Sequence, residues 1–233
     1  FEQALIDLGY DDALDDSVLT ANISGVTYLN VSNDSISDLT GIEDFTALTT
    51  LFCSNNALTA LDISSNTALI NFDCGYNSLT SLDVSSNTAL TGLGCYSNEL
   101  TSLDVSNNTA LIALQLQSNS LTSLDISSNI ALDHLTVQNN QLTSLDVSNN
   151  TALIHLNISD NNLDSLDVSN NTALTHLYCY ANQLTSLDVN SNTALSMLNC
   201  QVNQLTSLDI SNNTGLMRLL CNGNQLDSLD VSN

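Results

Sequence analysis

Three equally spaced histidines are the residues best suited to ligand chemistry. His134, His155 and His176 are the only histidines in the chain, the interval between neighbours is 21, and each precedes a leucine in a short alternating segment. If successive turns of the chain stack in register, their imidazoles form a column on an outward face. Imidazole nitrogen binds Zn²⁺ and Cu²⁺, but no carboxylate is an obvious partner for the rings.

Chance variation among exposed strand positions is the simplest origin of such a column. Its alternative is a ligand-contact patch, which we prefer to a metal site because His and Tyr present amphipathic surfaces to proteins or sugars. The candidate ligand-contact residues are Tyr96, His134, His155, His176, Tyr178 and Tyr180.

A second series consists of aspartates in the tripeptide Leu-Asp-Val/Ile, which recurs at the same interval as the histidines. Stacked coils would place neighbouring carboxylates about 4.8 Å apart, with a repulsion of roughly 0.9 kcal/mol per pair in water. The column then either solubilises its face and accepts hydrogen bonds from adjacent serines, or binds Ca²⁺ weakly. No cofactor is required, and the candidate calcium ligands are Asp83, Asp104, Asp125 and Asp146; the whole series is Asp62, Asp83, Asp104, Asp125, Asp146, Asp167, Asp188, Asp209 and Asp230.

The six cysteines share one position of the period, which Leu116, Val137 and Ile158 occupy in the other coils. The position therefore accepts a small apolar side chain, and a free thiol behaves as one. Parallel side chains on stacked coils keep Cβ atoms about 4.8 Å apart, beyond the usual disulfide range. We expect reduced thiols at Cys53, Cys74, Cys95, Cys179, Cys200 and Cys221.

The remaining residues do not indicate catalysis. No nucleophile paired with a base and no glycine-rich phosphate loop can be assembled, so we predict that the chain is not an enzyme. Asp11, Asp12, Asp15 and Asp16 form an acidic cluster without the spacing of an EF-hand, which favours a solvated loop.

The charge balance limits the classes of partner. The 233 residues hold 25 Asp and Glu against one Lys or Arg, which is Arg218, for a formal net charge of −24. Nucleic acid and anionic lipid are therefore excluded as direct partners. No apolar run reaches about 18 residues, so no membrane insertion is expected.

The 21-residue period predicts the elements that position these side chains. Within residues 69–89, Leu69, Phe72, Cys74 and Asn77 are followed by a second half with the same spacing. An apolar triplet of period two indicates a short strand, and the Asn after it indicates a turn. Each coil is thus predicted to hold two short parallel β-strands, and the fold to be mainly β.

Asparagine recurs at both corners of every coil, where backbone groups lack a strand partner. An inward amide can donate and accept at the same time, so we assign these residues a structural role. The second corner carries Asn66 to Asn213 at the same spacing. The first corner carries Asn56, Asn77, Asn98, Asn119, Asn140, Asn161, Asn182, Asn203 and Asn224.

The motif L-x-x-L-x-(C/V/I)-x-x-N in both halves of each coil resembles the leucine-rich repeat signature. Its double occurrence within each coil is similar to the nested bacterial class called IRREKO, and the resemblance covers residues 26–233. It implies a right-handed solenoid, usually an interaction module, in a secreted or cell-surface bacterial protein. Further repeats or domains are expected after Asn233.

The N-terminal segment departs from the pattern. Phe1, Ala4, Leu5 and Leu8 mark one helical face, with Gly9 as a C-terminal stop. We predict a small helical cap over residues 1–25, because the end of a stack of coils needs a cover. The solenoid, residues 26–233, begins with a first repeat that is longer by one residue and continues with 21-residue coils.

The two faces of the coils differ in their outward residues. The second half repeats Ser-Asp-Ser almost unchanged, whereas the first strand varies from Thr50 and Phe52 to Arg218 and Leu220. We predict recognition or adhesion through the variable face, with an extracellular protein or polysaccharide as partner. The alternative is a purely structural spacer rod, with Ca²⁺ along the Asp column as a candidate stabiliser.

Overall fold

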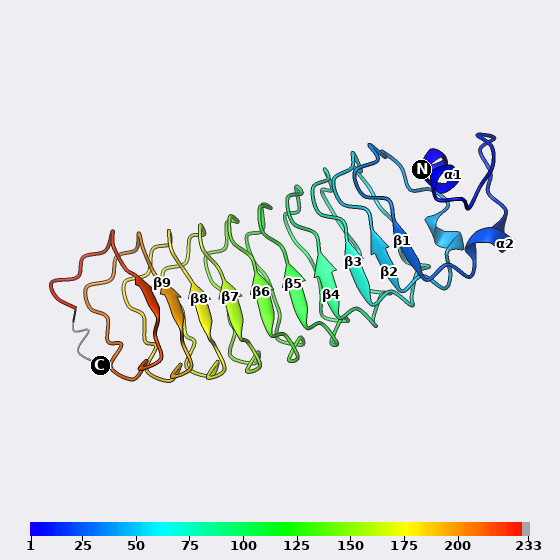
Figure 1. Cartoon of the computed structure of the whole chain (residues 1–233). Coiled ribbons are helices and arrows are strands. Elements are labelled where there is room, and N and C mark those ends of the chain that lie inside the picture. The colour runs from blue at the N-terminus through cyan, green and yellow to red at the C-terminus, as the bar shows by residue number, and fades with distance from the viewer. Residues whose placement is uncertain (230–233) are drawn as a thin grey trace.

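The computed structural model describes residues 1–229, and Asp230 to Asn233 lie outside the described residues. One parallel sheet of ten strands runs along the molecule in sequence order (Figure 1). This arrangement confirms a mainly β parallel solenoid. The strands are β1 (Tyr28–Asn30), β2 (Thr50–Phe52), β3 (Asn71–Asp73), β4 (Gly92–Gly94), β5 (Ala113–Gln115), β6 (His134–Thr136), β7 (His155–Asn157), β8 (His176–Tyr178), β9 (Met197–Asn199) and β10 (Arg218–Leu220).

The strand register follows the sequence period. Leu29 pairs with Leu51 across the longer first step, and Leu114 pairs with Leu135 in a regular one. These central residues point inward and are fully or almost fully buried. In most coils, the strand has one buried residue between two more exposed ones, as expected from the alternation of side chains.

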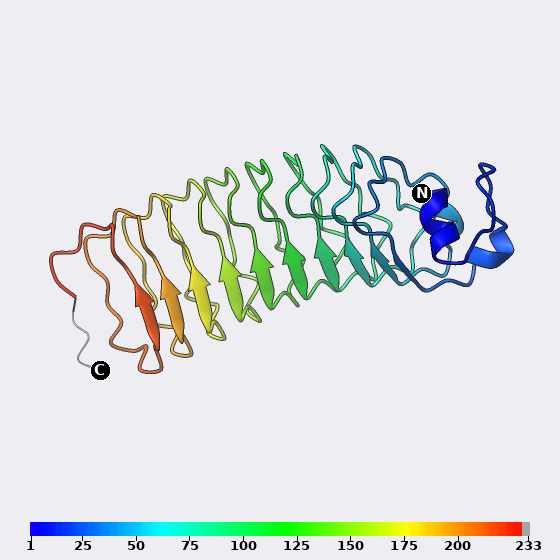
Figure 2. The same cartoon turned by 45° about the horizontal axis from the view of Figure 1, so that its top comes forward.

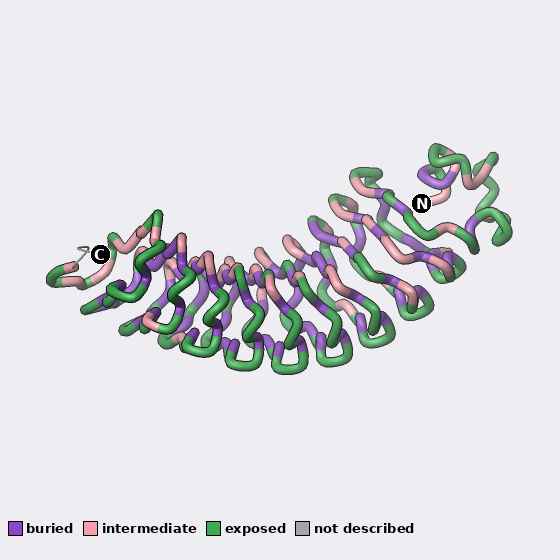
Figure 3. Tube along the Cα trace, turned by 60° about the horizontal axis from the view of Figure 1, so that its bottom comes forward, coloured by how far each residue is buried: buried purple, intermediate pink, exposed green. Residues whose placement is uncertain are grey.

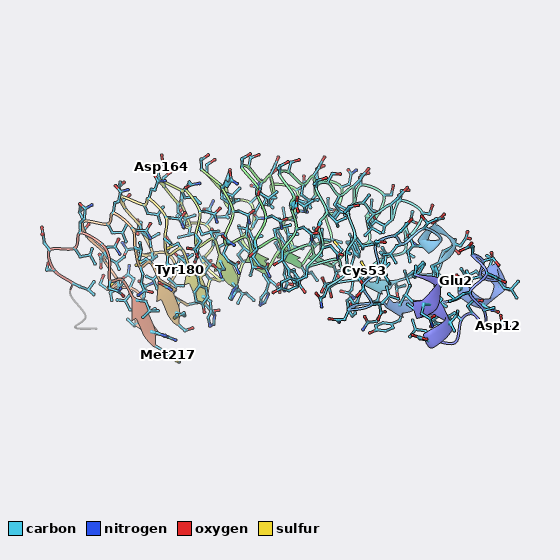
Figure 4. All side chains as sticks on the ribbon, turned by 90° about the horizontal axis from the view of Figure 1, so that it is seen from above. Glu2, Asp12, Cys53, Asp164, Tyr180 and Met217 are labelled. Carbon is cyan, nitrogen blue, oxygen red and sulfur yellow. The ribbon has the colours of Figure 1, made fainter. Side chains whose placement is uncertain are left out.

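The molecule is a bowed rod. Figure 2 shows the strands as one continuous row, and Figure 3 shows buried residues running inside the coils with exposed turns around them. The strands line the inner side of the bow, and Tyr180 lies on this side while Asp164 lies on the opposite one (Figure 4). Within residues 1–229 no helix is long and apolar enough to cross a membrane.

The second expected strand of each coil does not form in the described part of the chain. Asp83 Oδ1 accepts the backbone N–H of Ser85 at 2.9 Å, and Asp104 does the same for Ser106. This local bond satisfies a donor that a strand ladder would otherwise use. The inward residue Val84 is nevertheless fully buried. The alternation of apolar residues in this half therefore indicates which side chains are buried, although in the described coils the backbone here forms no strand hydrogen bonds.

The first asparagine series forms the turns after the strands, as predicted. Asn140 Nδ2 donates to the carbonyls of Leu116 and Val137 at 3.0 and 3.1 Å. Its Oδ1 accepts the N–H of Leu121 at 3.0 Å. The side chain therefore joins its own coil to the preceding one, and equivalent bonds recur from Asn56 to Asn224.

The second asparagine series donates but does not accept. Asn108 Nδ2 donates to the carbonyls of Val84 and Asn87 at 3.0 and 2.9 Å in the preceding coil. Its buried Oδ1 has no hydrogen-bond partner, and the same holds from Asn66 to Asn213. The expectation that each inward amide donates and accepts is thus wrong for this series, because no donor lies within hydrogen-bond distance of the amide oxygen.

A left-handed residue precedes each asparagine of the first series. The φ angles of Asn139 and Ala181 are 57° and 50°, and that of Val202 is 52°. This conformation suits Gly and Asn, whereas a β-branched residue adopts it with strain. Gly223, at the equivalent position of the next coil, has φ 73° without that strain.

The N-terminal segment contains two short helices, α1 (Glu2–Asp7) and α2 (Thr20–Ile23), and the first repeat contains the 3₁₀ helix η1 (Ile42–Asp44). The ring of Phe1 lies 6.1 Å from that of Phe45, and Leu5 is buried. Gly9 follows α1 with φ 78°, as a C-terminal stop does. Leu8 does not share the inward face predicted for it, because it lies past the last helical turn and is 47% exposed.

Candidate functional site

The sheet brings the three histidines together on the inner face of the bow. His134 pairs with His155, and His155 with His176, across β6, β7 and β8. Neighbouring imidazole centroids are 5.8 Å apart in both pairs, with interplanar angles of 9° and 28°. The rings therefore stack as a column, as the spacing predicts.

Tyr178 completes this group from the end of β8. Its ring centroid lies 5.4 Å from His155 and 6.4 Å from His176. We call His134, His155, His176 and Tyr178 the imidazole–tyrosine cluster. Each of its members is at least partly exposed, so a partner can reach the rings.

Two of the imidazoles are oriented by hydrogen bonds at Nδ1. Asp133 Oδ1 lies 2.7 Å from His134 Nδ1, and a carboxylate can only accept, so this nitrogen carries the hydrogen. Thr175 Oγ1 lies 2.8 Å from His176 Nδ1 and donates its own hydrogen to the Ile154 carbonyl. The same tautomer is thereby assigned to His176, and in the neutral rings Nε2 is left as a hydrogen-bond acceptor.

The carboxylate beside His134 is a correction to the sequence interpretation, which found no such partner. Asp133 precedes β6, where strict alternation does not reveal its position next to the ring. Such a pair orients imidazoles in metal sites. Within residues 1–229, however, no three His, Cys, Asp or Glu side chains converge as a metal site requires.

The middle imidazole has the most perturbed environment. Burial lowers the pKa of His155, and the neighbouring His134 and His176 lower it further. A charged His155 would lose hydration and repel charged neighbours. At neutral pH the centre of the cluster is therefore an uncharged aromatic surface.

Two predicted ligand-contact tyrosines lie outside the cluster. A hydrogen bond with Asp160 is the main reason that the pKa of Tyr180 is raised. Tyr96 follows β4, donates its phenolic hydrogen to Asp73 Oδ2 at 3.1 Å, and packs edge to face with Tyr76. The structure thus groups the three histidines with Tyr178 and places Tyr96 on another part of the same face.

The aspartates of the second half share one environment. Asp83, Asp104, Asp125 and Asp146 each accept hydrogen bonds from the serine two residues later, and these bonds lower their pKa values. The neighbouring carboxylates partly oppose this shift at Asp83, Asp125 and Asp146. This local bonding gives the carboxylates a role in chain geometry, and calcium binding by them stays a prediction.

The described cysteines are free thiols inside the coils. Cys53, Cys74, Cys95, Cys179 and Cys200 are buried, and Cys221 is half-buried. Burial is the main reason that the pKa of Cys200 rises to about 12 and that of Cys74 rises well above its usual value. These thiols therefore act as core side chains rather than as nucleophiles.

One feature of the inner face was missed by the sequence interpretation. Gly92 and Gly94 are the two outward residues of β4, and a depression of about 200 Å³ lies over them. Side chains from β2, β3 and β5 surround it. The two glycines at outward strand positions are the sequence signal that could have predicted this depression, because they lack the side chains that cover the strand in the other coils. The lining residues are Phe52, Asn71, Phe72, Asp73, Gly92, Leu93, Gly94, Ala113 and Gln115.

Comparison with known proteins places these features in a family. No family model matches the chain. A 51-residue stretch is 43% identical to internalin J of Listeria monocytogenes, covering 22% of this chain and 6% of that protein. The solved functional domain of InlJ from the same organism, described as including a cysteine ladder, matches with TM-score 0.91 and 43% identity over 93% of this chain.

The chain spans 48% of that InlJ domain. The L. monocytogenes internalin InlF matches with TM-score 0.79 and 25% identity, over 92% of this chain and 63% of that one. The plant receptor RGFR1, solved with the hormone RGF2, matches with TM-score 0.76 and 25% identity, over 88% and 37%. The chain is therefore a leucine-rich repeat protein, and its coils are like those of the bacterial internalins.

Proposed function

We propose that this chain is a non-enzymatic recognition and adhesion module of a secreted or surface-exposed bacterial protein. Its binding surface is the inner face formed by the outward side chains of the strands, and its partner is an extracellular protein or polysaccharide. The observation that carries this proposal is the imidazole–tyrosine cluster, whose partly exposed rings stack across three neighbouring strands.

The two sides of each coil support this choice of surface. In successive coils, the outward aspartate of the second half accepts the backbone N–H of the serine two residues later. Outward residues of the strands change from coil to coil and include His, Tyr, Phe and Gly. Side chains of this kind form amphipathic contact surfaces, in which aromatic rings are enriched.

The chemistry of the cluster indicates what a partner must offer. With Nδ1 of His134 and His176 carrying the hydrogen, an unprotonated Nε2 accepts hydrogen bonds, so hydroxyl, amide or ammonium donors match it. The net charge of −24 disfavours a strongly acidic partner. The named relatives are internalins and a peptide-binding receptor, which is consistent with macromolecular recognition by this fold.

A protein and glycan array tests the proposal. The wild-type chain is compared with the triple variant His155→Ala, His176→Ala, Tyr178→Ala, and with a back-face control, Ser102→Ala, Ser106→Ala. We expect the triple variant to lose at least tenfold in signal for a ligand that the control still binds. Equal binding by all three proteins, or no ligand for any, would favour the spacer rod.

The spacer rod is the second candidate, because the back face repeats one hydrogen bond along its length. In its cation-stabilised form, Ca²⁺ bridges the carboxylates of Asp83, Asp104, Asp125 and Asp146. Addition of CaCl₂ should then raise the melting temperature, and EDTA should reverse the rise. An unchanged melting temperature would show that Ca²⁺ does not stabilise the fold.

A further inference from the structure

We propose that the depression over β4 binds one uncharged pyranose unit of a glycan. The site lies on β2 to β5, apart from the imidazole–tyrosine cluster on β6 to β8. It rests on the proposed function, because it lies on the inner face to which that function assigns partner binding. The proposal goes beyond that function because it assigns a class of ligand, a neutral pyranose, to the part of the inner face over β4.

The shape of the site comes from one coil whose strand lacks outward side chains. Gly92 and Gly94 pair in register with Asn71 and Asp73 on one side and with Ala113 and Gln115 on the other. The flanking strands are therefore about 10 Å apart, twice the strand spacing. The volume of about 200 Å³ equals that of roughly seven waters in the liquid, which suits one small ring.

The glycines are needed to keep this space open. A Cβ at Gly92 would lie 2.9 Å from Asn71 Oδ1, and a Cβ at Gly94 would lie 3.3 Å from Asp73 Oδ1. The side chains of β3 thus lean over the bare backbone of β4. Any residue larger than glycine would occupy the floor.

The rim supplies hydrogen-bonding groups that the described chain does not use. The amides of Asn71 and Gln115 line opposite sides of the depression, and the structure shows no side-chain hydrogen bond for either one within residues 1–229. Each amide offers two donors and one acceptor. Together they match vicinal hydroxyl groups, which also donate and accept.

Asp73 adds an acceptor that is held in place. Its Oδ1 accepts the Gly75 N–H at 2.8 Å, and its Oδ2 accepts the phenolic hydrogen of Tyr96 at 3.1 Å. The Tyr96 ring packs directly over Gly75, where a Cβ would approach it to 2.5 Å. The carboxylate is therefore oriented before a ligand arrives, which reduces the entropy lost on binding.

Phe52 supplies the apolar wall. Its half-exposed ring lines the depression and packs edge to face with Tyr28 at 5.8 Å. A pyranose has an apolar C–H face and a hydroxyl edge, so it can contact this ring and the amides at the same time. The polar rim disfavours a purely aliphatic ligand, since its amides would be buried unpaired.

The charge of the site excludes an acidic sugar. Asp73 lies at the depression, and the single Lys or Arg of the chain, Arg218, lies on β10. A sialylated, sulfated or phosphorylated unit would meet a carboxylate with no cation to pair with. The site therefore favours a neutral sugar over an anionic one.

Saturation-transfer NMR with monosaccharide probes tests the subsite. The probes are the methyl glycosides of glucose, galactose, mannose and N-acetylglucosamine, with N-acetylneuraminic acid as the anionic control. We expect transfer to at least one neutral glycoside at millimolar concentration and none to the acid. The variant Gly94→Gln, which copies the equivalent residue of the next coil, should weaken the signal at least tenfold.

Controls separate the depression from the fold and from the cluster. Thr136→Gln places the same side chain at the equivalent position of β6 and should keep the signal. The double variant Asn71→Ala, Gln115→Ala removes the rim without filling the floor and should also weaken it, so the test does not depend on the folding of Gly94→Gln.

The outcomes distinguish this inference from the proposed function. The triple variant of the imidazole–tyrosine cluster should retain monosaccharide binding while losing its array ligand. Absence of transfer to every neutral glycoside at millimolar probe, or transfer that persists in both depression variants, overturns the subsite. Array binding of proteins alone, with no glycoside transfer, overturns the subsite and leaves the proposed function standing.

Discussion

Asn140 shows how many hydrogen bonds one side chain can form between two neighbouring coils. It donates to carbonyls in its own and the preceding coil and accepts the N–H of Leu121. Its relative Asn129 donates to two carbonyls of the preceding coil but leaves a buried oxygen without a partner. Residues of the same type thus have different energetics, because only the first corner offers a donor to the amide oxygen.

Replacement of Asn140 by alanine should lower stability by about 1 to 3 kcal/mol, since it leaves the Leu121 N–H without a partner and removes one of the two amide donors of the Leu116 and Val137 carbonyls. Urea unfolding followed by circular dichroism measures the change. Gln141→Ala, at a neighbouring exposed position, is the control and should shift the midpoint little. An Asn140→Ala midpoint equal to wild type would refute the assignment.

The middle histidine should make stability depend on pH. The pKa of His155 in the folded chain lies below the usual 6.5. As the pH falls from above 6.5 to below it, the unfolded chain therefore binds more protons than the folded chain, and stability is lost. His155→Gln removes this contribution. Between pH 7.5 and 5.5 the urea midpoint of wild type should fall more than that of the variant.

NMR titration of His155 should give a pKa below the usual 6.5 in the folded protein. If the urea midpoints of wild type and His155→Gln fell equally with pH, the link between His155 and stability would be wrong. The carboxylates are common to both proteins, so their titration cannot cause a difference between them.

At this scale, sequence spacing predicted the histidine column, the buried cysteines and the first asparagine series. It did not predict Asp133 beside His134, because a residue just before a strand does not follow the alternation. It also placed Tyr96 and Tyr180 with the histidines, although spacing along the chain does not show that each tyrosine has its own carboxylate partner, Asp73 or Asp160.

At the scale of elements, each coil has one strand rather than two within residues 1–229. The pattern of apolar residues is the same in both halves, so it could not separate a laddered strand from a buried irregular segment. The difference comes from the aspartate, whose carboxylate takes the N–H of the serine two residues later. The left-handed residue was hidden as well, because its identity changes from Tyr76 to Ala181 and Val202.

Val202 is the position where this turn is most strained. A β-branched residue at φ 52° is unfavourable, and the residue is 57% exposed, so little burial is lost on replacement. Val202→Asn should therefore raise stability by about 1 kcal/mol. The measurement is the urea midpoint. Val202→Thr keeps the branched Cβ and should give no gain, and a gain from Thr equal to that from Asn would count against strain.

At the scale of the whole molecule, each coil contacts the coil before it and the coil after it. Among the described strands, each pairs with its neighbours in the sequence, and the asparagine bonds also reach one coil back. Stability in such an array is approximately a sum of coil and interface terms. The rod is thus divisible in units of one coil, a property that the period alone indicated.

Deletion of residues 99–119 should leave a folded, shorter rod, because Asn98 is then followed by Ser120, which is equivalent to Glu99 in the 21-residue period. The far-ultraviolet spectrum should be retained, with a lower melting temperature from the loss of one interface. Deletion of residues 99–108 removes half a coil and should prevent continuous stacking. Cooperative unfolding of the half-coil variant at the wild-type temperature would argue against modular stacking.

The asparagine amides also give the rod a polarity. From Asn66 to Asn213 each Nδ2 donates toward the N-terminal neighbour, and the first series does so in part. During synthesis the acceptors of each coil therefore leave the ribosome before the amide that requires them. Assembly from the N-terminus onward lets the second-corner amide of each new turn bond to a surface that is already built.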